Sequence, residues 1–322
     1  MVLGPSTATT EVKMGLITNM YKKNFLHRYD KDEAIPYFSA SDFPGLGCEE
    51  NVFENSVHVP IRFFKYYYSD YDRTTLVLFC PGMGPGHTAY LAEIETLCRA
   101  GYPVLTLDYT GCGASGGERL NSINAPTRDM AELIERLQPR ERLVLIGHSL
   151  GGYTALNLAH LLPTVHKAVI LSGFVSVADV MIGFVKLRLL ANIVKSYEKK
   201  LLPRYGNLNN RAYLKSTSDK LLWIHSTDDP MVNFKHNAGQ VLALGNPNVR
   251  VLTVEHKKHN PQYSKEALDT MNNWMGEYYR LIKEEKLVSL ESRKAFFADK
   301  PIGRMTMQDP EIFAEILDFI RG

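Results

Sequence analysis

The sequence predicts a mostly parallel α/β sheet with helices on both of its faces and a helical cap inserted into it. Two observations carry this prediction. Short apolar runs alternate with helical patterns from residue 50 to residue 173, and the same rhythm returns after residue 219. Such alternation is typical of parallel sheets, because each helix returns the chain to the edge where the next strand begins. With 322 residues, 45% of them hydrophobic, the chain can bury one large core.

The expected strands are short apolar runs that end in polar or turn-forming residues. The run Thr-Leu-Val-Leu-Phe-Cys at residues 75–80 predicts a fully buried strand. A second buried strand is expected at residues 143–146, directly before a glycine-rich turn. The remaining runs predict strands at residues 61–67, 103–107, 167–171, 221–224 and 249–254.

The expected helices lie between these strands and have apolar residues at helical spacing. The last helix has the clearest start, with Asp309 as its N-cap and Pro310 in its first turn. Its apolar residues recur from Ile312 to Ile320 at helical spacing, so we expect it to pack on the core. The other patterns predict helices at residues 87–100, 125–137, 153–162, 234–244 and 262–282.

The alternation pauses at residues 174–218, where a mixed apolar and basic helical pattern covers residues 180–200. We therefore expect a helical cap at 174–218, inserted into a core of residues 50–173 and 219–322, with an N-terminal extension at 1–49. The apolar side of this pattern is too broad for a plain surface helix. Its members are Val180, Met181, Phe184, Val185, Leu187, Leu189, Leu190, Ile193 and Val194. Either they pack on the rim of the sheet, or part of them roofs a pocket for an acyl chain or an aromatic acid.

Composition excludes several classes of function. The formal net charge of +2 gives no basis for a nucleic-acid partner. Four cysteines at irregular spacings, without a Cys-x-x-Cys pair, favour a reduced protein over a disulfide framework or a zinc site. No run approaches the roughly 18 apolar residues of a membrane span, and the amino terminus lacks a signal-peptide pattern. The sequence thus predicts a cytoplasmic protein that needs no metal or cofactor.

The turn Gly147-His148-Ser149-Leu150-Gly151 stands between a predicted strand and a predicted helix. A Gly-x-Ser-x-Gly turn in that context exposes the serine hydroxyl above the sheet. Side chains at Gly147 or Gly151 would collide with the neighbouring strand or helix. The start of the helix also directs free backbone N–H groups at the reacting centre. Ser149 is therefore our candidate nucleophile.

A serine nucleophile needs a histidine base oriented by a carboxylate. On this topology the acid and then the base are expected in loops that follow later strands. The strand at 221–224 leads to Asp229, and the strand at 249–254 leads to His259. Asp228, adjacent to Asp229, is an alternative acid, and His256 is an alternative base.

These motifs resemble those of the α/β-hydrolase superfamily, in particular its serine-aminopeptidase-like and monoglyceride-lipase-like branch. The resemblance covers roughly residues 50–282 and the last helix. The serine turn matches the nucleophile elbow, Asp229 before Pro230 matches the acid position, and His259-Asn260-Pro261 matches the histidine loop. The loop Asp-Tyr-Thr-Gly-Cys-Gly-Ala-Ser at residues 108–115 is similar to the family's Asp-x-x-Gly-x-Gly-x-Ser loop.

The oxyanion loop departs from the family pattern. The family loop usually begins His-Gly, whereas this chain has Pro81-Gly82-Met83-Gly84. Because backbone N–H groups bind the oxyanion, the change leaves the donors in place. We assign the oxyanion hole to the amides of Met83 and Leu150, with Gly84 as the alternative to Met83.

The predicted function is that of a serine hydrolase. We expect it to cleave a carboxylic ester with an apolar acyl group through an acyl-enzyme on Ser149, with a small-molecule acyl substrate as its partner. The serine turn does not distinguish an esterase from a thioesterase or an aminopeptidase, because the attacked carbonyl is much the same. The rival from another class is a non-catalytic binding module of the same fold.

Overall fold

The computed structural model describes the chain from residue 5 to residue 322, and its strands form a single sheet. The strands are β1 (Gly47–Glu54), β2 (Pro60–Tyr67), β3 (Thr75–Cys80), β4 (Val104–Leu107), β5 (Arg142–His148), β6 (Val165–Leu171), β7 (Lys220–Ser226) and β8 (Val249–Val254). Their order in the sheet is β1-β2-β4-β3-β5-β6-β7-β8. Strands β3 to β8 run parallel, and β2 is antiparallel to both β1 and β4. The predicted fold class is confirmed.

Every predicted strand is present to within two residues at either end. Strand β1 was not predicted, and it crosses the expected boundary at residue 49. Seven of its eight residues are exposed or half-buried and only Phe53 is buried, so the strand has no apolar run to reveal it. Pairing with β2 over its full length holds it at the edge of the sheet.

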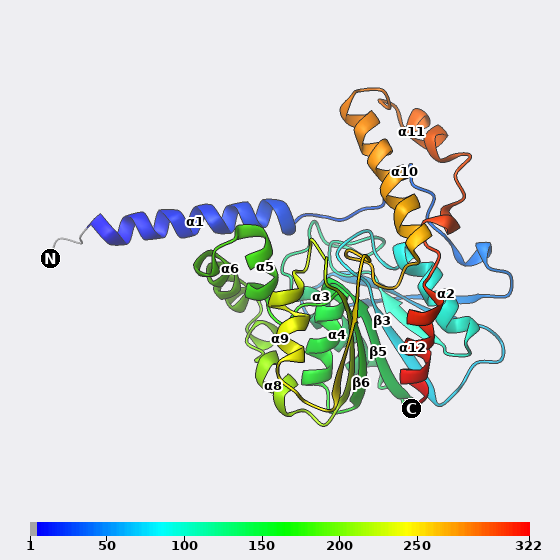
Figure 1. Ribbon diagram of the computed structural model, residues 1–322, viewed down its shortest axis with the longest axis horizontal. Helices are drawn as coiled ribbons and strands as arrows, with labels where there is room; N and C mark the ends of the chain where they lie inside the picture. Colours follow the sequence, from blue (N-terminus) through cyan, green and yellow to red (C-terminus); the bar gives the residue numbers. More distant parts are fainter. Residues whose placement is uncertain (1–4) are drawn as a thin grey trace.

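Helices cover both faces of the sheet (Figure 1). One face packs against α3 (Ala125–Leu137), α4 (Leu150–Leu161), α8 (Asn210–Ser216) and α9 (Ala238–Leu242). The opposite face packs against α2 (Leu91–Arg99) and α12 (Pro310–Arg321). The other helices are α1 (Pro5–Phe25), α5 (Val177–Val185), α6 (Arg188–Leu201), α7 (Pro203–Gly206), α10 (Lys265–Lys283) and α11 (Leu290–Phe297), with 3-10 turns η1 (Ala40–Asp42), η2 (His87–Tyr90), η3 (Phe234–His236) and η4 (Ile302–Arg304).

The last helix begins as predicted. The Asp309 side chain accepts hydrogen bonds from the amides of Glu311 and Ile312, so it acts as the N-cap of α12. Ile312, Ile316 and Ile320 are buried against the sheet. The pattern at 234–244 instead forms a 3-10 turn and a short helix, because Asn237 between them has non-helical backbone angles.

The helices α5 to α8 lie between β6 and β7 in the sequence, and we call them the inserted helices. The single helical pattern expected at 180–200 is two helices, since Lys186 adopts a left-handed conformation with φ of 59° that ends α5. Val180 and Met181 are buried, whereas Leu187 and Leu189 are exposed, so the broad apolar side is divided between interior and surface.

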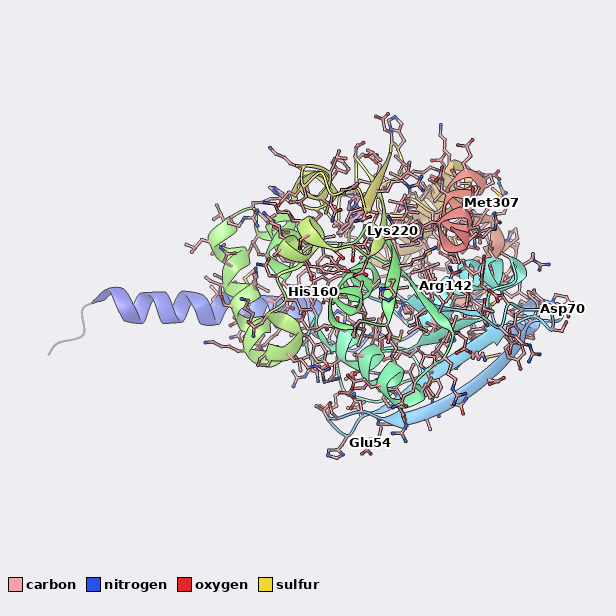
Figure 2. All side chains as sticks on the ribbon, turned by 90° about the horizontal axis from the view of Figure 1, so that it is seen from below. Glu54, Asp70, Arg142, His160, Lys220 and Met307 are labelled. Carbon is pink, nitrogen blue, oxygen red and sulfur yellow. The ribbon has the colours of Figure 1, made fainter. Side chains whose placement is uncertain are left out.

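Helix α1 packs across the inserted helices at its carboxyl-terminal end and extends beyond them at the other, as two perpendicular views show (Figures 1 and 2). The Phe25 ring meets Phe184 of α5 edge to face, with ring centroids 5.2 Å apart. Within residues 5–322, no helix is long and apolar enough to cross a membrane. All four cysteines are free thiols, and only Cys48 is exposed.

Candidate active site

The turn after β5 holds Ser149 in a strained backbone conformation. Its φ is 56° and its ψ is −116°, outside the regions that non-glycine residues usually occupy, which is typical of functional turns. A β-carbon at Gly147 would lie 2.1 Å from the Gly151 oxygen, and one at Gly151 would lie 1.8 Å from the Cys80 oxygen. Both contacts involve backbone atoms, so only glycine fits at these two positions, as the sequence predicts.

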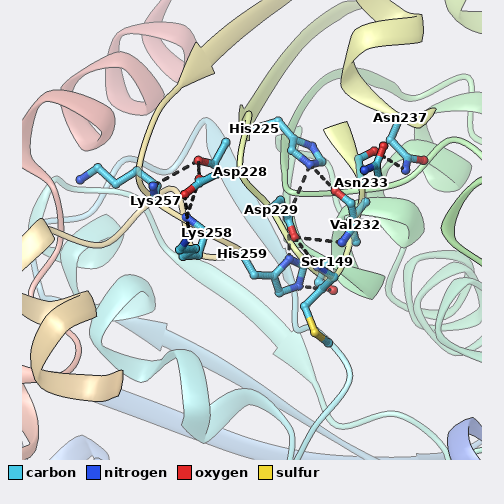
Figure 3. A network of polar contacts seen from close by, with 12 residues as sticks. Ser149, His225, Asp228, Asp229, Val232, Asn233, Asn237, Lys257, Lys258 and His259 are labelled. Atoms are coloured by element: carbon cyan, nitrogen blue, oxygen red, sulfur yellow. Dashed lines mark hydrogen bonds and ion pairs between the residues drawn. The ribbon is translucent and has the colours of Figure 1, made fainter. Parts of the chain in front are cut away.

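The parallel register of β5, β7 and β8 brings three predicted residues together at one edge of the sheet (Figure 3). His259 Nε2 lies 2.9 Å from Ser149 Oγ, and His259 Nδ1 lies 2.8 Å from Asp229 Oδ2. A carboxylate only accepts hydrogen bonds, so His259 Nδ1 carries the ring proton and donates a hydrogen bond to Asp229. Nε2 is then free to accept from the Ser149 hydroxyl. The three side chains form a continuous Ser–His–Asp relay.

The surroundings of Asp229 keep its carboxylate charged. Its Oδ1 accepts hydrogen bonds from the amides of Met231 at 2.8 Å and Val232 at 2.9 Å. Burial alone would raise the pKa of Asp229, but hydrogen bonds from two histidines and the Val232 amide hold that pKa well below its usual range. A charged carboxylate in this position stabilises a protonated His259.

His225 is a second histidine partner of Asp229, and no sequence motif pointed to it. Its ring is fully buried, and its Nδ1 accepts a hydrogen bond from Trp223 Nε1 at 3.3 Å. Because indole N–H only donates, His225 must carry its own proton on Nε2. That nitrogen lies 2.8 Å from the Val232 oxygen and 3.3 Å from Asp229 Oδ2. His225 is therefore placed to orient the Asp229 carboxylate, since its Nε2 lies beside Oδ2, the oxygen that also meets His259.

The alternative acid and base lie elsewhere. Asp228 accepts hydrogen bonds from Ser226 Oγ and the Lys258 amide and pairs with Lys258 Nζ at 3.0 Å. It therefore holds the histidine loop without touching His259 (Figure 3). His256 is exposed and makes no contact with Ser149 or Asp229 among the described residues.

His148, within the serine turn, supports the backbone of His259. Its Nε2 lies 2.8 Å from the His259 carbonyl oxygen, which only accepts, so Nε2 carries the proton. Its Nδ1 then accepts from the Tyr90 hydroxyl at 3.0 Å. Burial, with a further contribution from His259, lowers the pKa of His148 to about 3. The ring therefore stays neutral at ordinary pH and holds the histidine loop beside Ser149.

Met83 and Leu150 lie where oxyanion donors are expected. Both line the cavity that contains Ser149, whereas Gly84 does not. Within residues 5–322 neither the Met83 nor the Leu150 backbone N–H donates a hydrogen bond to the protein. The Met83 side chain is held by Tyr29, whose hydroxyl lies 2.9 Å from its sulfur, a contact that sequence patterns did not reveal.

A cavity of about 440 Å³ opens at Ser149, within the range of small-molecule sites. Its walls are largely apolar and include Phe25 from α1 and Val180, Met181 and Phe184 from α5. Part of the apolar side at 180–194 thus faces the nucleophile. In the part of the chain that the structure describes, no aspartate or glutamate lines this cavity, and no group of three or more His, Cys, Asp or Glu is placed to hold a metal ion.

A buried carboxylic acid contacts the segment that follows His259. Glu93, on α2, is 1% exposed, and its Oε1 accepts a hydrogen bond from Gln262 Nε2 at 3.4 Å. Glu93 Oε2 and Gln262 Oε1 have no partner among the described residues. Burial raises the pKa of Glu93 to about 7, so below that pH the carboxyl retains a proton that makes it a donor.

Glu93 is expected to make the protein less stable as pH rises. Between pH 4.5 and about 7 the native state keeps a proton on Glu93 that the unfolded state releases. The free energy of unfolding should therefore fall by about 2 to 3 kcal/mol between about pH 5 and pH 8 through this group. Glu93→Gln, which cannot titrate, should lack this contribution. Urea unfolding of both proteins across that pH range measures this contribution. If the free energy of unfolding of the two proteins depended on pH in the same way, the raised pKa of Glu93 would be contradicted.

Comparison with known proteins places this chain in a family. Residues 72–245 match the family model described as serine aminopeptidase, S33, which covers more than half of the chain. An esterase of Pyrococcus furiosus has a similar structure, with a TM-score of 0.56 at 17% identity over 81% of this chain and 96% of that one. The thioesterase domain from the curacin biosynthetic pathway has a TM-score of 0.50 at 16% identity, over 66% and 94%. At such identities the two structures show the fold alone.

Curated relatives match shorter segments. A segment of 109 residues, 33% of this chain, is 30% identical to the Oryza sativa subsp. indica protein named probable esterase PIR7A and covers 41% of it. A segment of 179 residues, 52% of this chain, is 27% identical to proline iminopeptidase of Saccharolobus solfataricus and covers 57% of it. The chain thus spans about half the length of the curated relatives that it matches.

Proposed function

The chain belongs to the serine aminopeptidase S33 family of α/β-hydrolases, and on that premise we propose that it is a serine hydrolase that cleaves carboxylic esters with an apolar acyl group. The observation that carries the proposal is the relay from Ser149 through His259 to Asp229 at the floor of an apolar cavity. The inserted helices act as the cap of this site, because α5 supplies part of the cavity wall.

The first half of the reaction forms an acyl-enzyme. Ser149 Oγ attacks the ester carbonyl carbon while its proton moves to His259 Nε2. Asp229 stabilises the imidazolium that forms, and the amides of Met83 and Leu150 donate to the oxyanion. The tetrahedral intermediate then breaks its bond to the alcohol oxygen, which leaves with the proton from His259.

The second half releases the acid. Water attacks the acyl carbonyl and gives a proton to His259 Nε2, so a second tetrahedral intermediate forms in the same oxyanion hole. When that intermediate collapses, Ser149 Oγ leaves and regains the proton from His259. One ester and one water yield one alcohol and one carboxylic acid, and the enzyme returns to its starting state.

The cavity favours an ester over the amino-terminal peptides that an aminopeptidase cleaves. A substrate ammonium group buried without a counter-charge is strongly unfavourable. Among residues 5–322, the residues that line the cavity include no aspartate or glutamate, so the site offers no partner for that charge. An uncharged acyl group has no such requirement.

A fluorophosphonate probe tests the proposal directly. We expect the native protein to be labelled at Ser149, identified by mass spectrometry of the labelled peptide, and the Ser149→Ala variant to remain unlabelled. The probe reacts only with a serine that is activated by a base. A folded native protein that resists labelling would instead favour the non-catalytic binding module.

A further inference from the structure

A second apolar space adjoins the cavity at Ser149. It is a groove of about 620 Å³ between α1 on one side and α5 and α6 on the other. Three residues, Phe25, Met181 and Phe184, line both the cavity and the groove, so only these side chains lie between the two spaces. The cavity, at about 440 Å³, is large enough to hold a short acyl group by itself.

We infer that the groove binds the distal part of a long linear acyl chain whose carbonyl lies at Ser149. This inference rests on the proposed function and names its substrate class. Helix α1 lies outside the predicted core and supplies one wall of the groove through Ile17, Met20 and Tyr21, while α6 supplies Leu190 and Val194. The N-terminal segment thereby becomes part of the substrate site.

A buried carboxylate anchors α1 in the position that forms the groove. Glu198 of α6 is fully buried, and its Oε1 accepts a hydrogen bond from Tyr21 of α1 at 2.6 Å. Its Oε2 accepts from Ser122 and from Asn124, which precede α3 in the core. Helix α1, the inserted helices and the core are therefore tied at one point, and the Tyr21 ring also packs against Tyr197 of α6.

Two polar side chains line the groove, and each makes a hydrogen bond within the protein. The Tyr21 hydroxyl donates to Glu198, and Asn24 Nδ2 donates to the Met20 oxygen at 2.8 Å. The remaining lining residues are apolar, and none of the residues that line the groove is charged. Such a largely apolar surface without charged residues suits the methylene chain of an acyl group and not its polar head.

A series of p-nitrophenyl esters from butyrate to hexadecanoate tests the inference. In the native protein we expect kcat/KM to rise about 4-fold for each methylene that enters the groove. Leu190→Trp or Ile17→Trp fills the groove and should lower the ratio of kcat/KM for dodecanoate to that for butyrate by at least about 10-fold.

Two control variants carry a tryptophan at the neighbouring position in the same helix, outside the groove. Leu189 of α6 is 74% exposed and Leu16 of α1 is 62% exposed, and neither lines the groove. Leu189→Trp and Leu16→Trp should therefore keep the native ratio within about 2-fold. The groove is disproved if the native protein shows no preference for longer chains, or if controls and groove variants change the ratio equally. If the Leu190→Trp protein does not fold, the comparison of Ile17→Trp with Leu16→Trp on α1 decides the outcome.

Direct binding separates this inference from the proposed function. Dodecanoate is titrated calorimetrically into Ser149→Ala protein with and without Leu190→Trp or Leu189→Trp. We expect weaker binding only with Leu190→Trp. If dodecanoate binds and only Leu190→Trp weakens that binding, while the native protein resists labelling by fluorophosphonate, the groove is supported and the proposed function fails. If Ser149 is labelled but Leu190→Trp changes neither dodecanoate binding nor chain-length preference, the groove is not an acyl-chain site and the proposed hydrolase function still stands.

Discussion

Replacing Ser149 by alanine is expected to lower kcat for a p-nitrophenyl ester by about a million-fold, to the level that the remaining site provides. The variant loses the nucleophile, so no acyl-enzyme forms and His259 has no proton to accept. The β-carbon and the strained backbone are retained, so the free energy of unfolding should change by no more than about 0.5 kcal/mol. Steady-state kinetics and urea unfolding measure the two effects separately.

Ser172 provides a matched control for that change. It too has a positive φ, of 45°, and it directly follows β6, the strand next to β5. Its hydroxyl is buried without a hydrogen-bond partner among the described residues. Ser172→Ala removes an unsatisfied polar group and should leave kcat within about 2-fold of native. A similar loss of activity in both alanine variants would show that disturbance of the sheet edge, and not loss of the nucleophile, stops the reaction.

Asp229→Asn is expected to lower kcat by about 10⁴-fold, which corresponds to about 5 kcal/mol of transition-state stabilisation. The amide cannot stabilise the imidazolium at His259, and its NH₂ group favours the wrong tautomer of that ring. The native pKa of Asp229 is well below its usual range, so the carboxylate stays charged throughout the working pH range. The dependence of native kcat on pH should therefore show no loss of activity at acidic pH that is caused by protonation of Asp229.

The neighbouring carboxylate is the control. Asp228→Asn removes a charge at the same loop, but Asp228 contacts Ser226 and Lys258 and leaves the His259 ring untouched. We expect its kcat to stay within about 10-fold of native, because only the placement of the histidine loop is affected. If Asp228→Asn were the more damaging change, the acid would have been assigned to the wrong residue.

Much of the fold and of the site follows from local patterns in the sequence. The central strands β3, β4, β5 and β7 are buried along all or nearly all of their length, so each one needs an unbroken apolar run. The serine turn needs glycine at 147 and 151 because backbone atoms occupy the space of a side chain there. Edge strand β1 escaped detection for the opposite reason, since an exposed strand has no apolar requirement.

Adjacent candidates could be separated only in three dimensions. Asp228 and Asp229 follow the same strand, and His256 and His259 share one loop, so spacing along the chain does not distinguish them. The backbone of that loop does, because His256 and Lys258 adopt positive φ values of 60° and 50° that turn the chain. His259 faces Ser149 as a result. The support from His148 likewise depends on a contact between residues that are 111 positions apart, whereas His225 reaches Asp229 from the end of the same strand.

By itself the sequence determined the sheet, the serine turn and a short list of partners for Ser149, because those features depend on local burial and backbone sterics. The tertiary structure alone decided which acid and base meet the serine and how the space around them is shaped. The groove between α1 and α6 joins residues that are more than 150 positions apart, and the bond from Tyr21 to Glu198 spans 177 positions. Ile17, Met20, Tyr21 and Phe25 recur at helical spacing, but that spacing does not reveal which distant segment of the chain their side of the helix meets.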